Sequence, residues 1–577
     1  MKNIAEQGLS RRSFLTGAAA TGALAAFGLA GCAPQAKAET SGDATKADAA
    51  ETKADASAQT DWLGSAPDIA AGDIKETKQT DLLIIGAGNG GMAAAATAAD
   101  LGLDFMLCEK SGSIQRSRHW FGAINTKYTE TAGAHVDEGR LLNEFSRYAS
   151  GQCDQRVIRV WIKESASVVD WIDPILTQAG MTCAFDNDID HETGGTSFAL
   201  FPMEHYYSGK DAAGEALERN KVLLSYINDK GYDVTYNHKL VKLVQDDAGK
   251  VTGAIFEADG GYVQVDAAKG VLLTTGGYTS NAEMLRACNP MVDRCVTLQY
   301  GSPNNVGEGI KAGMWAGAQK DSIGAPMIFD RGTVKPGENA GIISSPGETA
   351  TFVGTDKQFN LGSQPLMKVT RDGKRFVNES TPYDFCCFAA AEHEGGVFCQ
   401  VFDSNLKEDV KRFNTIGCSR QTQQLLAKEA DTPLDEIYAD QLEKGTMVKA
   451  DTIEELAKGL GIPAENLKKT VERQNENYDN QVDPDFGKEA FRLSPVRKAP
   501  FYGVRTSGYM LCTLDGITIN ENFQAVNEEG EAIEGLYVTG VDSGSYYAHT
   551  YPNMSTGNCC GRSVTFARMI GKALAAK

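Results

Sequence analysis

The sequence predicts an α/β protein in which one alternating strand-and-helix domain is interrupted by an inserted α+β domain. Three stretches far apart in the chain support this prediction, since each reads as a short apolar strand that ends in small residues. They begin near residues 80, 270 and 535. Strands of this kind are typical of a buried parallel sheet.

The first stretch, residues 80–94, runs from an apolar strand through glycines into an alanine-rich helix. Its glycines have the G-x-G-x-x-G spacing, which allows a tight turn and a close approach of the backbone to a pyrophosphate. The candidate binding residues of the turn are Gly86, Gly88, Asn89, Gly90 and Gly91. A second apolar run ends at Glu109, followed by Lys110, about where an acid that binds ribose is expected. Strand, helix and acid together predict a dinucleotide site.

The other two stretches favour FAD over NAD. Residues 270–278 form a buried-type strand that ends in Gly276 and Gly277, and residues 535–542 deliver Asp542, which could hold a ribityl chain. Residues 555–561 then open a helix that runs to about residue 575. The N-terminus of this helix would offer donors and positive potential to the pyrimidine edge of a flavin. Its candidate residues are Gly557, Asn558 and Cys559.

Together the three stretches resemble the flavoprotein family that includes fumarate reductases, urocanate reductases and 3-ketosteroid dehydrogenases, from about residue 78 to the end. The resemblance implies FAD as the cofactor and a Rossmann-like FAD-binding domain with an inserted α+β capping domain. The family's polar flavin-loop position falls on Ser117, while Gln115 and Arg116 replace two glycines. Arg116, Arg118 and His119 could contact the diphosphate or a substrate, or pair with acidic side chains.

The predicted order of domains follows from shifts in composition. Residues 110–235 contain three amphipathic helices, near 136–149, 155–179 and 214–230. The capping domain contains a hairpin with an Asp-Gly turn at 367–379 and two helices within 452–475, separated by Gly-Ile-Pro. The predicted boundaries are 1–31 for a signal peptide, 32–75 for a disordered tether, 76–335 and 506–577 for the FAD-binding domain, and 336–505 for the capping domain.

The N-terminal residues resemble an export signal. Ser10-Arg-Arg-Ser-Phe-Leu15 is a twin-arginine pattern, and Leu29-Ala-Gly-Cys32 resembles a lipoprotein processing site. The apolar stretch between them has about 15 residues, fewer than the ~20 of a spanning helix, so an uncleaved anchor is the less favoured interpretation. The next residues have almost no large apolar side chains and predict a flexible tether. We expect twin-arginine export and a lipid anchor at Cys32, on the outer face of the cytoplasmic membrane.

Composition excludes some functions. The chain has 577 residues and a net charge of −20 without a basic stripe, which argues against nucleic acid as a partner. Its 13 cysteines are irregularly spaced and are expected to be mostly small buried residues. No C-x-x-C-H haem site and no C-x-x-C cluster is present, so no metal site is predicted. An iron–sulfur centre built from scattered cysteines stays open.

The candidate active site differs from that of fumarate reductases. Their proton-donating arginine lies four positions after the glutamate of the family hairpin, which is Tyr383 here, and their second carboxylate-binding arginine falls on Met554. Their histidine pair corresponds to the stretch 510–516, which has no histidine. Because a buried dicarboxylate without cationic partners is very costly, we expect that fumarate is not the substrate.

The same positions resemble 3-ketosteroid dehydrogenases. That resemblance implies that Tyr383 exchanges a proton with substrate carbon, and that the Tyr551 hydroxyl and the Ser555 backbone N–H bind the carbonyl oxygen. Tyr206 or Tyr207 would orient Tyr383. A tyrosine with a pKa of about 10 is protonated at neutral pH and is a competent acid, and each donor on the oxygen would contribute about 3 kcal/mol to stabilising an enolate. The alternative is that both tyrosines are packed aromatics.

These observations predict an exported FAD-dependent oxidoreductase that reduces a C=C bond conjugated to a carbonyl in a small unsaturated carbonyl or steroid-like substrate. Electrons would come from a separate protein, such as a membrane-associated c-type cytochrome, because no covalent haem site or second dinucleotide fingerprint is present. Two alternatives remain open. The same site could work in reverse as a ketosteroid-type dehydrogenase, or the protein could be a flavin-loaded lipoprotein that relays electrons or binds a ligand.

Overall fold

A computed structural model describes residues 61–118, 120–186, 198–355, 357–413, 419–553 and 555–577. The predicted signal peptide and most of the predicted tether lie outside these ranges. Residues 61–75, also assigned to the tether, contact the domain: Trp62 packs against the core. Lys242 Nζ donates to the Pro67 carbonyl at 3.2 Å, and Trp315 Nε1 donates to the Gly64 carbonyl at 3.1 Å. This part of the chain therefore lies along the folded domain.

The larger sheet has the order β16-β17-β9-β1-β2-β6, with β8 on β9 and β7 on β8. Its strands are β1 (Ile74–Ile85), β2 (Phe105–Cys108), β6 (Val234–Thr235), β7 (Lys239–Gln245), β8 (Val251–Ala258), β9 (Gly261–Leu273), β16 (Gln524–Val526) and β17 (Ala532–Val538). β1 runs parallel to β2 and β9, and β9 runs parallel to β17. The carboxyl ends of β1, β9 and β17 therefore meet at one edge, which brings the three predicted stretches together.

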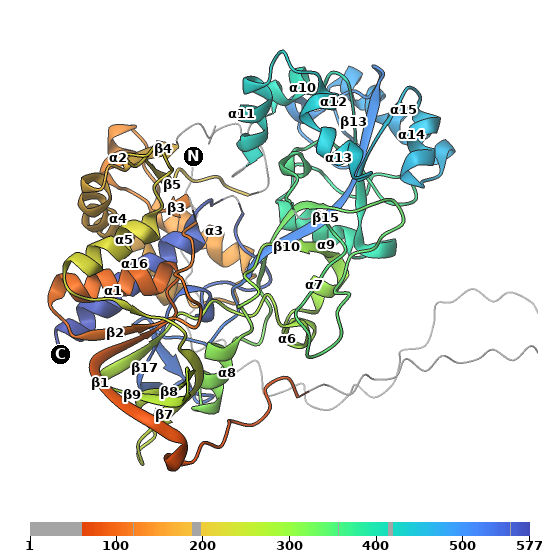
Figure 1. Ribbon diagram of the computed structural model, residues 1–577. Coiled ribbons are helices and arrows are strands. Elements are labelled where there is room, and N and C mark those ends of the chain that lie inside the picture. Colours follow the sequence, from red (N-terminus) through yellow and green to blue (C-terminus); the bar gives the residue numbers. More distant parts are fainter. Residues whose placement is uncertain (1–60, 119, 187–197, 356, 414–418, 554) are drawn as a thin grey trace, which may run out of the picture. The chain divides into compact units, whose positions relative to one another are not determined.

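Two helices made of small residues at their contact surfaces cover this sheet. α1 (Asn89–Leu101) packs against α16 (Asn558–Ala575), and the two lie side by side in Figure 1. A Cβ on Gly571 would lie 2.5 Å from a methyl group of Thr97, so the helices approach closely there. At the start of α1, a Cβ on Gly91 would lie 1.8 Å from the Gly86 carbonyl oxygen. The predicted Rossmann-like α/β fold is confirmed.

The three helices predicted between residues 110 and 235 are α3 (Glu138–Tyr148), α4 (Gln155–Gln178) and α5 (Arg219–Asp229). Acidic side chains cap them: Asp137, Asp154 and Glu218 each accept a backbone N–H of the first turn. The expected starts at 136 and 214 were therefore early. A small antiparallel sheet lies beside them, formed by β3 (Trp120–Gly122), β4 (Thr182–Asp186) and β5 (Glu204–Ser208).

The second large sheet is built around β15 (Phe501–Thr513), which pairs with four other strands. They are β10 (Val296–Gln299), β11 (Pro326–Thr333), β13 (Phe398–Asp403) and β14 (Met447–Ala450), and β12 (Met367–Val369) pairs with β13. β10 and β11 precede the predicted boundary at 336, and β15 crosses the boundary at 505. The inserted domain thus shares its sheet with flanking segments.

Two sequence predictions inside this region have clear outcomes. The two helices are α14 (Ile453–Leu460) and α15 (Ala464–Asn480), separated by Gly461 at φ 68°. The Asp-Gly turn forms, since the Thr370 N–H donates to the Lys374 carbonyl at 3.0 Å. The predicted hairpin is only a single bridge between Val369 and Arg375, because β12 pairs with β13 instead.

The remaining helices are α2 (Lys127–Thr131), α6 (Ala282–Cys288), α7 (Pro290–Cys295), α8 (Glu308–Trp315), α9 (Tyr383–Ala390), α10 (Leu406–Arg412), α11 (Arg420–Lys428), α12 (Leu434–Ile437) and α13 (Ala439–Glu443). Short 3-10 turns are Ala71–Asp73, Asn360–Ser363, Glu394–Gly396, Ala490–Arg492 and Gly540–Asp542. Within the described ranges, no helix has both the length and the apolar composition required to span a lipid bilayer.

Candidate active site

A cavity of about 460 Å³ lies at the sheet edge where β1, β9 and β17 end. All three predicted stretches contribute to its wall. The glycine turn supplies Gly86, Gly88, Asn89 and Gly90, the end of β9 leads to Thr274, Thr275 and Gly276, and the C-terminal stretches supply Gly540, Val541, Gly557 and Cys559. The cavity therefore contains the predicted cofactor site.

The glycine turn fits a pyrophosphate. Gly86 has φ +103°, and a Cβ there would lie 2.4 Å from the Thr274 carbonyl oxygen, so only glycine allows this approach. A Cβ on Gly88 would meet nothing within 4 Å. No side chain caps the first turn of α1 or of α16. Both helix N-termini therefore offer N–H donors and positive potential for a bound dinucleotide.

Glu109 and Lys110 also line this cavity. Glu109 is held in place because its carboxylate accepts the Ala87 N–H at 2.8 Å and the Ser111 N–H at 3.0 Å. Lys110 forms an ion pair with Glu308 and also donates to the Asn304 carbonyl. These positions suit the ribose end of a dinucleotide, with the Glu109 carboxylate fixed beside the glycine turn.

Five predicted cofactor residues do not line this cavity: Gly91, Ser117, Gly277, Asp542 and Asn558. Gly91 packs against Gly86, and the Ser117 N–H donates to a Glu218 carboxylate oxygen at 2.5 Å. Asn558 accepts the Tyr547 hydroxyl at 2.5 Å. Their direct contacts with the cofactor stay predictions.

Asp542 lies one layer behind the cavity wall. Its carboxylate accepts the Gly277 N–H at 2.8 Å and the Thr275 hydroxyl at 2.8 Å, and also accepts the Thr275 N–H. Burial raises the pKa of this carboxyl, and the hydrogen bonds oppose that effect. Asp542 thus holds the second glycine turn in shape. A contact with the ribityl chain stays a prediction, because the carboxylate faces the turn.

Tyr551 lies on the cavity wall. Its hydroxyl donates to the Ser555 carbonyl at 3.2 Å and accepts the Cys559 N–H at 3.3 Å, so it is directed at the start of α16. Burial raises the pKa of Tyr551 well above its ordinary value, which keeps the phenol protonated. The Ser555 N–H donates to the Pro552 carbonyl at 2.8 Å. In this structure a tight turn occupies that donor, and the use of Ser555 on a substrate oxygen stays a prediction.

Tyr383 begins α9 and is buried, but it is not among the residues that line the cavity. Its hydroxyl accepts the Ser419 N–H at 3.2 Å. Its ring centroid is 5.5 Å from that of Phe329, and the Arg331 guanidinium carbon is 5.6 Å from the Tyr383 ring centroid. Phe329 and Arg331 both line the cavity, so Tyr383 lies one layer behind that wall.

Tyr207 faces a smaller adjoining pocket of about 240 Å³, which Ser117 also lines. The Tyr207 hydroxyl donates to Asp173 Oδ1 at 3.2 Å, so in this structure it orients toward that carboxylate. Tyr206 instead packs against Trp120, with ring centroids 5.1 Å apart. The proposed orienting role of either tyrosine toward Tyr383 stays a prediction.

Sequence reasoning missed Arg331, and it left Arg118 undecided. Both arginines line the cavity, and Arg116 does so too. Arg118 stacks on Tyr300, with 4.8 Å between the guanidinium carbon and the ring centroid. The family's arginine positions carry no charge in this chain, but other elements bring guanidinium groups to the cavity. The sequence signal for Arg331 is its place just after the apolar run 326–329, within the buried strand β11.

A buried ion pair fixes Arg331. Arg331 Nε donates to the Ser363 hydroxyl at 2.7 Å, and that hydroxyl donates to Asp330 Oδ1 at 2.7 Å. Lys368 Nζ lies 2.9 Å from Asp330 Oδ2, and both side chains are 1% exposed. This chain of contacts gives the guanidinium a defined orientation at the cavity wall.

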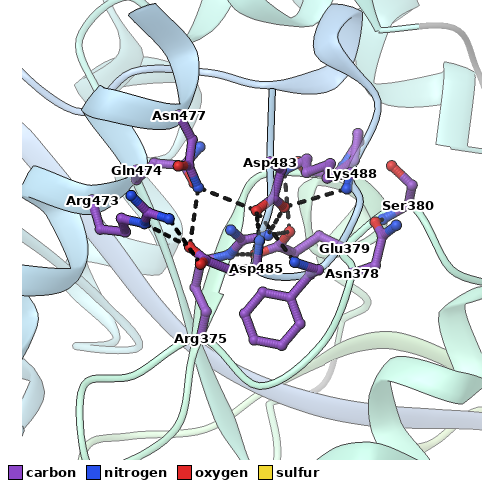
Figure 2. Close-up of polar contacts among 12 residues, drawn as sticks. Arg375, Asn378, Glu379, Ser380, Arg473, Gln474, Asn477, Asp483, Asp485 and Lys488 are labelled. Carbon is purple, nitrogen blue, oxygen red and sulfur yellow. Dashed lines mark hydrogen bonds and ion pairs between the residues drawn. The ribbon is translucent and has the colours of Figure 1, made fainter. Parts of the chain in front are cut away.

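A second ion cluster anchors the loop that leads to Tyr383 (Figure 2). Arg375 binds Glu379 through two hydrogen bonds, at 2.8 and 2.7 Å, and reaches Asp483 at 2.9 Å. Lys488 Nζ is 3.3 Å from Glu379 Oε2. Burial alone would raise the pKa of Glu379, but Lys488 and Arg375 hold it at about 2. Burial lowers the pKa of Lys488 to about 8 despite Glu379.

The cluster also connects to the first ion pair. The Lys368 backbone N–H donates to Glu379 Oε1 at 3.2 Å. Lys488 donates to the Pro365 carbonyl, and Lys368 Nζ donates to the Gln364 carbonyl at 3.3 Å. The two clusters therefore both hold the segment 364–379. In the described part of the chain, no group of three or more metal-ligating side chains is present.

The family described as FAD binding domain matches residues 81–557. The vinyl phenol reductase of Lactiplantibacillus plantarum is 26% identical over 502 residues, covering 85% of this chain and 95% of that protein. The urocanate reductase of Eggerthella lenta is 25% identical over 509 residues, covering 87% and 75%. The crystal structure of 3-ketosteroid delta1-dehydrogenase from Sterolibacterium denitrificans superposes with a TM-score of 0.66 at 19% identity, covering 86% of this chain and 100% of that chain, and it shows a shared fold.

Proposed function

We propose that this protein reduces a C=C bond conjugated to a carbonyl or carboxylate group. The premise is that the chain belongs to the FAD binding domain family and is an FAD-dependent oxidoreductase. The glycine turn, Glu109 and the starts of α1 and α16 would hold FAD. When bound, FAD supplies hydride chemistry at its flavin ring. The relatives support this direction, since one is a vinyl phenol reductase and another a urocanate reductase.

One observation carries the proposal: a single cavity joins the dinucleotide turn to Arg331, Arg118 and Tyr551. Reduction of a conjugated alkene builds negative charge on the carbonyl oxygen. Guanidinium groups stabilise that charge, and they are strongest where water is excluded. Arg331 suits this task best, because it is 2% exposed and its orientation is fixed through Ser363.

Aromatic side chains shape the rest of the substrate end. Trp120, Tyr300 and Phe329 line the same cavity, and Gln358 and Gln421 add amide groups. A planar substrate with an aromatic part and one anionic or carbonyl end fits this lining. Flat rings are bound by stacking on aromatic faces, and the anionic end is bound by arginine.

The proton that completes the reduction is assigned to Tyr383, as the family resemblance implies. The phenol lies behind Phe329 and Arg331, so this assignment requires that the wall opens when substrate binds. A Tyr383→Phe variant tests it: turnover should fall by ~100-fold or more while apparent substrate affinity changes little. Unchanged turnover would remove Tyr383 from the reaction.

Location and electron supply are part of the same proposal. The twin-arginine pattern and Cys32 support export and a lipid anchor on the outer face of the cytoplasmic membrane. A separate membrane-associated c-type cytochrome would then deliver electrons. In cell fractions, the wild-type protein should sediment with membranes and Cys32→Ala should be released. Release of both would contradict the anchor.

The main experiment uses the FAD-loaded protein, reduced anaerobically with dithionite. It is mixed with aryl-substituted unsaturated acids or unsaturated ketones, and flavin absorbance is followed. Saturated ketosteroids are added to a separate sample in which the FAD is oxidised. We expect the unsaturated acids and ketones to reoxidise the flavin. If no conjugated alkene does so, the electron-relay alternative is favoured; if saturated ketosteroids bleach oxidised flavin, the dehydrogenase alternative is favoured.

Arg331→Met gives the sharpest variant. A hydrogen bond to a charged group contributes about 1.5–3 kcal/mol, so half-saturation by an unsaturated acid should shift by about 10- to 150-fold. Arg497→Met is the matched control, because Arg497 pairs with Asp479 on the surface and is 45% exposed. Equal shifts in both variants, or none in Arg331→Met, would exclude Arg331 from substrate binding.

A further inference from the structure

Arg219 is a buried cation that lies between the starts of the two helices that face the cofactor cavity. It is the first residue of α5 and is 3% exposed. Arg219 Nη2 donates to Asn89 Oδ1 at 3.0 Å and to Cys560 Sγ at 3.0 Å. Asn89 begins α1, Cys560 lies in the first turn of α16, and both residues line the cavity. One guanidinium group therefore connects the glycine turn to the start of the second helix.

The charge of Arg219 has no counter-ion in the described part of the chain. None of the ion pairs between described residues includes it, and its Nε has no hydrogen-bond partner. The neighbouring carboxylate, Glu218, instead accepts the Ser117 N–H and the Lys221 N–H. A buried charge without a counter-ion is costly, and this acidic chain has many carboxylates that could have served. The position of Arg219 therefore indicates that an anion from outside the chain compensates its charge.

Asn89 shows where this anion would bind. Because Arg219 holds Asn89 Oδ1, the Nδ2 donor of the same amide is left for another partner, and no described residue accepts from it. The preceding residue, Gly88, has open surroundings, since a Cβ there would meet nothing within 4 Å. No side chain caps the first turn of α1, so its backbone N–H groups are also available. The amide donor, these N–H groups and the guanidinium behind them form one positive region at the glycine turn.

We propose that Arg219 is the counter-charge for the diphosphate of FAD and acts through the Asn89 amide that it orients toward the cofactor. A diphosphate carries full negative charges, whereas backbone N–H groups at a helix start supply only partial positive charge. Lys110, a cation beside the same turn, is already compensated by its ion pair with Glu308. Arg219 is therefore a positioning residue for the glycine turn. The assignment rests on FAD as the cofactor and does not depend on the proposed reductase reaction.

The test measures how tightly the FAD-loaded protein retains its cofactor. The loaded protein is diluted, and the fluorescence of released FAD gives the dissociation constant. Arg219→Met and Arg219→Gln remove the charge, and each should raise the dissociation constant by about tenfold or more. Arg219→Lys keeps the charge and should raise it less than Arg219→Gln, which keeps only a hydrogen-bond donor. Arg505→Met is the matched control and should retain FAD like the wild type, because Arg505 is 2% exposed and donates to the Leu460 carbonyl at 2.6 Å.

The midpoint potential of the bound FAD separates the diphosphate from the flavin ring as the partner of Arg219. Measured by anaerobic spectroscopic titration, it should stay close to the wild-type value in Arg219→Gln and Arg219→Lys. A lowered potential in Arg219→Gln would place the charge at the flavin ring and overturn the proposal. An unchanged dissociation constant in Arg219→Gln would also overturn it, as would equal losses in Arg219→Gln and Arg219→Lys, which would assign Arg219 a packing role. If Arg219→Met does not fold, this pair of variants decides. Neither measurement uses an alkene, so the outcome is independent of the proposed reductase activity.

Discussion

Replacing Glu379 by glutamine should strongly destabilise the protein, because it removes the one carboxylate that Arg375 and Lys488 share. Arg375 makes two hydrogen bonds with it, and Lys488 Nζ lies 3.3 Å away. Glu379 and Lys488 side chains are 0% exposed, and that of Arg375 is 5% exposed. After the substitution Lys488 has lost its carboxylate and Arg375 retains Asp483 alone.

Two lines of reasoning give a similar magnitude. Removing one partner of a buried ion pair costs about 3–5 kcal/mol, since the other charge stays buried. Independently, the pKa of Glu379 falls from 4.5 to about 2 on folding. At about 1.4 kcal/mol per unit, this corresponds to about 3 kcal/mol of stability at neutral pH. We therefore expect Glu379→Gln to lose roughly 3–5 kcal/mol.

Urea unfolding at neutral pH, followed by circular dichroism, measures the effect, provided the slope with denaturant is unchanged. Glu408→Gln is the control, because Glu408 and Lys411 form an exposed pair, 64% and 66% exposed, and should lose less than about 0.5 kcal/mol. The double variant Glu379→Gln, Lys488→Met should recover part of the loss. A loss below about 1 kcal/mol in Glu379→Gln, equal to the control, would refute the reasoning about the buried cluster.

Three further predictions concern pH, fold and cofactor. Lys488 has a pKa of about 8 in the folded protein against an ordinary 10.5, so the unfolded chain binds more protons between these two pH values. The free energy of unfolding should therefore rise from pH 8 to 10.5. Lys488→Met should remove this rise when unfolding is measured as a function of pH. Gly91→Ala should abolish FAD retention or folding, because the new Cβ would lie 1.8 Å from the Gly86 carbonyl oxygen. Flavin content measures this effect. Gly88→Ala is the control and should fold, because the space around its Cβ is open. Asp542→Asn should lower FAD affinity by about tenfold or more in cofactor titrations, because the carboxylate that braces the Gly277 turn is lost.

The FAD-binding half of the fold could be predicted because its signals are local. The strand that ends at Ile85 runs directly into glycines, and β9 and β17 end in the same way. Parallel strands then bring these ends to one edge without any further information. Chain order and spacing alone were enough to predict that these three strand ends share one edge.

The second sheet could not be bounded from sequence, because its pairings join distant segments. β10 and β11 look like any short apolar runs, and only their pairing with β15 assigns them to this sheet. The register of such strands depends on which faces are buried in the folded state. The boundary predicted at 336 followed composition, which does not record strand partners.

Contacts at the substrate end of the cavity were harder to predict from the sequence, because the directions of hydroxyl and N–H groups depend on the residues around them. Tyr551 does reach the cavity, but Ser555 is committed to the Pro552 turn and Tyr383 is screened by Phe329. A sequence motif places a residue on an element. It does not show which partner takes its hydrogen bond.

Arg331 is a cavity charge that lies outside the positions where the family carries its arginines. The family's two arginine positions are Tyr383 and Met554 here, which is why the sequence predicts that fumarate is not the substrate. The structure brings a guanidinium to the same cavity from β11, held through Ser363 by the Asp330–Lys368 pair. Because electrostatic stabilisation depends on where a charge lies and how it is fixed, and not on which element carries it, an acid substrate is compatible with this site. The absence of a motif residue therefore excludes only the contact geometry that this residue would provide. To exclude a class of substrate, all charged groups that reach the cavity have to be considered.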